Sequence, residues 1–109
     1  MFDILFGNST ASKVLLYLAR MNEAYPREIA LNFSIPINMV QKQLEKMEQG
    51  GVLVSRLKGR TRVYEWNPRY PFREELLILL TKAFDFMPAS DMQKYYSKRT
   101  RPRRKGKPL

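Results

Sequence analysis

Histidine and cysteine are both absent from this chain of 109 residues. Their absence removes the commonest general base, the commonest transition-metal ligand and every thiolate site. No carboxylates or lysines fall into a recognisable catalytic motif, and no glycine-rich phosphate loop is present. We therefore expect no enzyme, no catalytic residue, no cofactor and no metal site. The remaining chemistry is that of cations and side-chain amides.

One group of cations surrounds a short turn at Gly59-Arg60. Its members are Arg56, Lys58, Arg60 and Arg62. A run of charge is usually only a solvated face. Here it follows two expected helices joined by a tight turn, and such a cationic loop favours contact with the phosphates of a nucleic acid.

A second group of polar side chains lies on one face of an expected helix over residues 37–49. The apolar residues of that helix recur at helical spacing and form its inward face: Ile37, Val40, Leu44 and Met47. The outward face carries Asn38, Met39, Gln41, Lys42, Glu45 and Lys46. The amides suit adenine, a lysine suits guanine or a phosphate, and Met39 suits a thymine methyl group. The alternative is a merely solvated polar face.

The net charge of +10 is concentrated near the C-terminus. Residues 94–109 hold eight cations and no acid, whereas residues 1–93 hold 12 cations and 10 acids. From residue 98 the cations are Lys98, Arg99, Arg101, Arg103, Arg104, Lys105 and Lys107. This excess points to nucleic acid or another anionic surface. The segment has too few apolar residues for a core, so we expect a disordered tail.

Helical periodicity and turn residues divide the first half of the chain. Ser9 or Thr10 is expected to cap a helix that runs to about Met21, followed by a connector over residues 22–25. A second helix begins at Pro26. Ser34-Ile35-Pro36 forms the turn before the helix over 37–49, which ends at Gly50-Gly51.

The second half begins with a hairpin, in which strands Val52–Lys58 and Thr61–Trp66 flank the turn. Phe72–Met87 is then expected as the longest helix, and its apolar surface exceeds one face. A second copy of the chain is the simplest cover for such surface, so we expect a homodimer. The candidate interface residues are Leu16, Tyr17, Leu77, Leu80 and Phe84, with ordinary core packing as the alternative for Leu16 and Tyr17.

The expected fold class is mostly α with a small antiparallel β-hairpin, that is, α+β. We expect one domain over residues 1–88 and a basic tail over 89–109, although 89–98 could add a helical turn or two. No long apolar run and no signal peptide are seen, so neither a membrane partner nor export is expected. A cytoplasmic, nucleoid-associated location follows.

The order of these elements resembles winged helix-turn-helix transcriptional regulators of the ArsR/MarR-like group over residues 3–87. The likeness is carried by Arg27–Ala30, by Val40–Leu53 and by Arg56–Tyr64, which is similar to the wing. Two positions depart from the family's pattern, since Ser34 stands where glycine is common and Pro36 where serine or threonine caps the next helix. The cysteine and histidine ligands of metal-sensing members have no counterpart.

The resemblance implies a winged helix-turn-helix with an added C-terminal dimerisation helix. It implies a sequence-specific, double-stranded DNA-binding repressor with helix 37–49 in the major groove. Residues Asn38, Met39, Gln41 and Lys42 would contact bases. Backbone contacts would come from Arg27, Lys46 and the cations of the wing, residues 56–62. The competing expectation is a winged-helix protein-interaction or RNA-binding module whose basic tail supplies nonspecific nucleic-acid binding. RNA or an acidic protein could be the partner of the tail.

Overall fold

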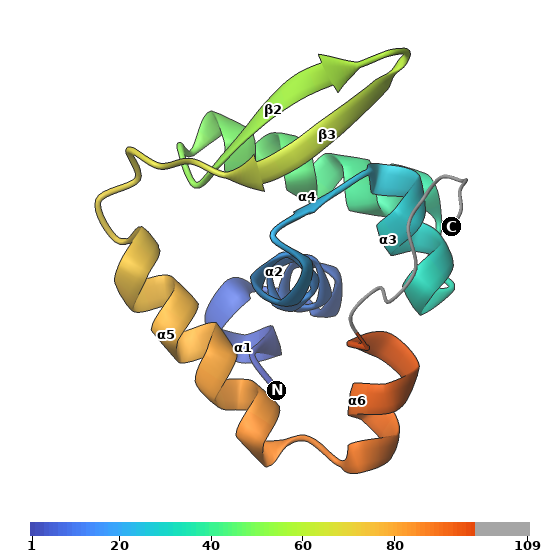
Figure 1. Cartoon of the computed structure of the whole chain (residues 1–109), viewed down its shortest axis with the longest axis vertical. Coiled ribbons are helices and arrows are strands. Elements are labelled where there is room, and N and C mark those ends of the chain that lie inside the picture. Colours follow the sequence, from blue (N-terminus) through green and yellow to red (C-terminus); the bar gives the residue numbers. More distant parts are fainter. Residues whose placement is uncertain (98–109) are drawn as a thin grey trace, which may run out of the picture.

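The computed structural model describes residues 1–97, and its element order is that of a winged helix-turn-helix (Figure 1). The elements are α1 (Asp3–Phe6), α2 (Ser9–Met21), β1 (Glu23–Ala24), α3 (Pro26–Phe33), α4 (Ile37–Gln49), β2 (Leu53–Lys58), β3 (Thr61–Trp66), α5 (Arg73–Ala83), the 3₁₀ turn η1 (Phe84–Phe86) and α6 (Ala89–Tyr95). The mostly helical α+β class is confirmed.

Helix α2 lies at the centre, and the other helices and the sheet surround it (Figure 1). Five consecutive residues, 14–18, are at most 5% exposed, so almost no side of this helix faces solvent. The residue that caps α2 is Asn8, whose Oδ1 accepts a hydrogen bond from the Ala11 amide at 2.7 Å. The expectation of Ser9 or Thr10 at the cap was wrong. The Ser9 hydroxyl instead accepts a hydrogen bond from Lys13.

The sheet has three strands in the order β1-β3-β2, one more than the sequence predicts. The additional strand, β1, lies in the segment expected to be a connector and pairs Ala24 with Tyr64. Two residues are too few to show the alternation that identifies a strand. The hairpin agrees with expectation in its turn and in β3, while β2 begins at Leu53 and not at Val52.

The turn between α3 and α4 forms without the glycine and the serine or threonine cap that are usual at its two ends. Ser34 adopts the left-handed conformation, with φ 56°, and ends α3 where glycine would be unstrained. The Ile35 amide donates to the Ala30 carbonyl at 3.0 Å, and the Ile35 side chain is half-buried. Pro36 supplies no side-chain cap, yet α4 begins at Ile37 and ends at Gln49 as predicted.

The helix expected over Phe72–Met87 is shorter than predicted. Helix α5 ends at Ala83 and continues as η1. It is therefore not the longest helix, because α2 and α4 are both longer. Leu80 and Ala83 are buried against α2 and its neighbours. Phe72 and Leu79 are instead 63% and 39% exposed.

Helix α6 extends the folded body beyond the expected domain boundary at residue 88. Tyr96 joins the hydrophobic core at 5% exposure, and the rings of Phe33 and Tyr95 stack at 5.3 Å. Arg20 Nε donates to the Tyr96 carbonyl at 2.7 Å, and Asn32 Nδ2 donates to the Tyr95 carbonyl at 3.0 Å. Residues 89–97 are thus part of the body. The basic residues from 98 to 109 lie outside the described residues.

The packing of Tyr96 predicts a loss of stability at alkaline pH. Burial raises the pKa of Tyr96 above the ordinary tyrosine value of 10.0, with a smaller contribution from Asp91. A raised folded-state pKa means that this stabilisation is complete below pH 10 and is lost as the pH rises towards the folded pKa. We expect the wild type to lose more unfolding free energy between pH 8 and pH 11 than Tyr96→Phe, measured by urea denaturation. Equal losses would contradict this account.

Candidate nucleic-acid interface

The outward face of α4 presents polar side chains that the protein itself leaves unused. Asn38, Gln41 and Lys42 are exposed, and Met39 is 46% exposed. None of these four side chains makes a hydrogen bond or ion pair within residues 1–97. The structure therefore places the four predicted base-contact residues together on one free surface.

The inward face of α4 holds that surface in a fixed position. Val40 and Leu44 are fully buried, and α4 packs against both α2 and α3. Ala30 of α3 is 7% exposed, and its small side chain lets α3 lie close to α4. Because both buried residues come from the middle of α4, the helix cannot rotate without exposing apolar surface.

The tip of the hairpin carries free cations, and Figure 1 shows the hairpin on the same side of the molecule as α4. The register pairs Lys58 with Thr61, and Gly59 takes the positive φ of 68° that closes the turn. Lys58 and Arg60 are exposed and make no ion pair within the described part of the chain. Both remain available to an external anion.

Arg56 is different from the other wing cations, because it is already paired. Its guanidinium contacts Glu65 at 2.6 Å and Glu23 at 3.2 Å. The hydrogen bond to Glu23 raises the pKa of Arg56, and the charge of Glu65 adds to the effect. Arg56 therefore joins all three strands, and its expected role as a phosphate contact is not supported. The sequence could not show this, since Glu23 lies far away along the chain.

Arg62 links the wing to the end of α4 through a hydrogen-bonded chain. Its Nη1 donates to Ser55 Oγ at 2.9 Å, and that hydroxyl donates to Glu48 Oε2 at 2.7 Å. Sequence reasoning missed Ser55 and Glu48. The antiparallel register was the only available signal, because it places Ser55 and Arg62 on the same face of the hairpin.

The remaining two backbone candidates, Arg27 and Lys46, are exposed. Lys46 lies in the last turn of α4. Arg27 lies in the first turn of α3, beside a hollow of about 300 Å³ where α3 meets α4. This hollow is lined by Arg27, Ala30, Leu31, Ser34, Ile35 and Ile37. Both cations therefore flank the polar face of α4 on the helix-turn-helix itself.

Three of the five expected dimer-interface residues belong to the core of the single chain. Leu16, Tyr17 and Leu80 are 3%, 4% and 0% exposed, so little of their surface is left for a partner. Tyr17 also donates a hydrogen bond to Glu28 at 2.6 Å, which ties α2 to α3. Core packing, the alternative given for Leu16 and Tyr17, is what the structure shows for all three, and this does not support their assignment to an interface. Leu77 and Phe84 are half-buried.

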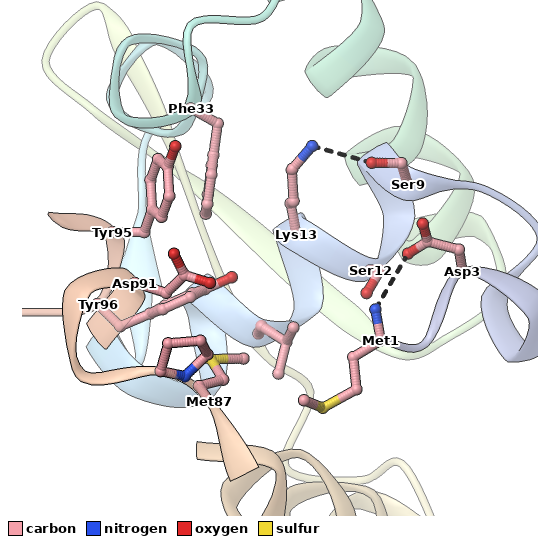
Figure 2. A pocket seen from close by; sticks show the side chains of 12 residues that line it. Met1, Asp3, Ser9, Ser12, Lys13, Phe33, Met87, Asp91, Tyr95 and Tyr96 are labelled. Atoms are coloured by element: carbon pink, nitrogen blue, oxygen red, sulfur yellow. Dashed lines mark hydrogen bonds and ion pairs between the residues drawn. The ribbon is translucent and has the colours of Figure 1, made fainter. Parts of the chain in front are cut away.

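A second hollow, of about 400 Å³, lies between α2 and α6, away from the α4 surface (Figure 2). Figure 2 shows Phe33 and Tyr95 on one side and Met1 and Asp3 on the other. The N-terminal amine contacts Asp3 at 3.7 Å. None of the lining residues comes from α4 or the hairpin. This hollow is therefore separate from the candidate interface.

The described residues contain no group of three or more metal-ligating side chains. No helix among residues 1–97 is long and apolar enough to cross a bilayer. The interface is accordingly built from exposed cations, amides and apolar side chains on α3, α4 and the wing.

Comparison with protein-family models and with curated proteins gives no significant match. Solved structures do match. The MarR-family transcriptional regulator from Rhodococcus sp. RHA1 has a TM-score of 0.58 at 14% identity, covering 84% of this chain and 71% of that one. YusO from Bacillus subtilis has a TM-score of 0.56 at 16% identity, covering 79% and 67%. A variant of ZitR from Lactococcus lactis has a TM-score of 0.53 at 18% identity, covering 79% and 66%.

These likenesses define the class of structure. The chain has a MarR-like winged helix-turn-helix fold, and it spans about two thirds of the YusO and ZitR chains that it matches. At such low identity the comparison shows the fold alone. What the interface binds has to be argued from its own residues.

Proposed function

We propose that this protein is a sequence-specific double-stranded DNA-binding transcription regulator that acts as a homodimer. The observation that carries the proposal is the free polar face of α4. Four side chains at residues 38, 39, 41 and 42, which are two amides, a thioether and an ammonium, are exposed and lack partners within residues 1–97. They stand on a helix whose other face is buried. A major groove admits an α-helix presented in this way.

The side chains near the start of α4 match the chemistry of base edges. Asn38 and Gln41 each carry an amide that can donate to and accept from adenine at once. Lys42 can donate to guanine or to a phosphate, and Met39 can lie against a thymine methyl group. These contacts would give sequence preference.

The cations around α4 match the phosphate backbone on both sides of such a groove. Lys58 and Arg60 lie at the wing tip, and Arg27 and Lys46 flank the helix-turn-helix. Arg62 donates to Ser55 at 2.9 Å, and Ser55 donates in turn to Glu48 of α4 at 2.7 Å, which ties the wing to α4. Contacts of this kind set position and supply most of the salt-dependent affinity.

A homodimer would place two copies of α4 against a two-part site. Its half-sites would lie about 10 base pairs or a multiple apart. Occupying such a site near a promoter excludes other proteins, which makes repression the simplest outcome. The Rhodococcus neighbour is named as a transcriptional regulator. A regulator of this kind works in the cytoplasm, on the nucleoid.

Selection of bound duplexes from a random pool tests this function. We expect full-length protein at a fixed salt concentration to enrich a pseudo-palindrome. Gln41→Ala/Lys42→Ala should bind the enriched site about 10-fold or more weakly and lose preference at the contacted positions, since each good base contact contributes about 1–3 kcal/mol. Enrichment of no sequence by the wild type would contradict the proposal.

Protein truncated after Ser97 separates the proposal from its competitor. The specific site should still be enriched, because α4 and the wing are intact. The affinity for DNA should fall, because the truncated protein keeps only one of the eight cations of residues 94–109. If truncation abolishes all binding and the α4 substitutions change nothing, the chain is a module that binds RNA or an acidic protein through its tail.

The ion pairs of Arg56 generate a second prediction, on the salt dependence of DNA affinity. Lys58→Gln should lower the slope of log affinity against log salt by about one, because one phosphate contact is lost. Arg56→Gln should leave the slope nearly unchanged, since its charge is taken up by Glu23 and Glu65. Fluorescence anisotropy with the selected duplex measures both slopes. Equal reductions would show that Arg56 contacts DNA as well.

A further inference from the structure

The outer face of α5 leaves apolar surface uncovered. Ile78 is 64% exposed, on the side of the helix opposite Leu80 and Ala83, which are 0% and 3% exposed. Phe86, in the turn that continues α5, is 70% exposed. A shallow hollow of about 500 Å³ runs along this face. Its lining residues are Arg73, Glu74, Leu77, Ile78, Thr81, Lys82 and Asp85.

The charged side chains on this face have no partner within the described residues. Glu74 and Lys82 are exposed and take part in no ion pair or hydrogen bond of residues 1–97. Each lies four positions from Ile78, one before it and one after it. Side chains four apart share a helix face, so an acid, an apolar residue and a base stand in line along α5.

This row of an acid, an apolar residue and a base is complementary to the same row on a second copy in one orientation only. If two α5 helices cross antiparallel on a two-fold axis at Ile78, every residue faces the one equally far on the other side of position 78. Glu74 then faces the partner subunit's Lys82, and Lys82 faces the partner subunit's Glu74. A parallel pair would set like charges against each other, which is destabilising.

We propose that the outer face of α5 binds a second copy of this chain, antiparallel and centred on Ile78. Two symmetric ion pairs, each between Glu74 and the partner subunit's Lys82, flank the contact between the two Ile78 side chains. At 1.5 Å per residue the two ion pairs lie about 12 Å apart along the helix. This inference rests on the homodimer of the proposed function and replaces the buried residues first assigned to the interface.

The pairing would also fix where α4 lies, because the link before α5 is tied to the end of α4. Asn67 Nδ2 donates to the Gly51 carbonyl at 2.9 Å, and the Asn67 amide donates to the Val52 carbonyl at 3.0 Å. The Asn67 carbonyl and Oδ1 accept from the Tyr70 and Arg69 amides. The α5 pair thereby sets the separation of the two DNA-reading helices.

Charge reversal followed by mixing tests the register directly. Sedimentation equilibrium of full-length wild type should show a reversible dimer. Glu74→Lys alone and Lys82→Glu alone should each dimerise at least about 10-fold more weakly, since both symmetric pairs become repulsive. An equimolar mixture of the two variants should recover wild-type association, because both pairs of the mixed dimer again join opposite charges, one as in the wild type and one with its signs exchanged.

The matched control is Glu45→Lys, which makes the same charge change at an exposed position of α4. It should dimerise as the wild type does. If either reversal leaves dimerisation unchanged, or if the mixture fails to recover it, this register is wrong. A wild type that stays monomeric at all concentrations would contradict the α5 pairing. If that monomer still selects single half-sites from the DNA pool, the proposed reading of DNA by α4 is unaffected.

Discussion

The structure depends on the burial of α2 on nearly all its sides. Residues 14–18 are at most 5% exposed, so each neighbouring element must cover a part of this one helix. Trp66 fixes the sheet to it, because the indole N–H donates to the Leu18 carbonyl at 3.1 Å in a buried position. Arg20 fixes α6 through the Tyr96 carbonyl. Exposing a buried side chain of α2 would lower the free energy of unfolding by several kcal/mol, and this cost keeps the surrounding elements in place.

A body organised around one buried helix leaves two outward surfaces with separate uses. On one, α4 and the hairpin present unpaired amides and cations, held by Val40 and Leu44 below. On the other, α5 presents Ile78 between an unpaired acid and an unpaired base. Asn67 connects them, since its hydrogen bonds tie the end of α4 to the start of α5. The proposed reading of DNA and the proposed pairing of subunits are thereby linked through hydrogen-bonded structure.

The sequence predicted those features that depend on local patterns. The period of 3.6 residues gave the bounds of α4, and the turn residues at Gly59-Arg60 gave the hairpin. It failed where distant residues meet. The pairing of Arg56 with Glu23 and the burial of Leu16 by other elements depend on tertiary contacts. Leu80 was assigned to the interface although it is buried, because apolar residues occur on both faces of α5 and periodicity alone could not tell core from interface.

The central claim is that the outward face of α4 reads the bases of duplex DNA. The most direct test is the NMR spectrum of labelled protein titrated with the duplex selected from the random pool. We expect the side-chain amide signals of Asn38 and Gln41 to shift strongly, together with backbone signals at Lys58 and Arg60. Shifts confined to residues 98–109, with Asn38 and Gln41 unchanged, would contradict it.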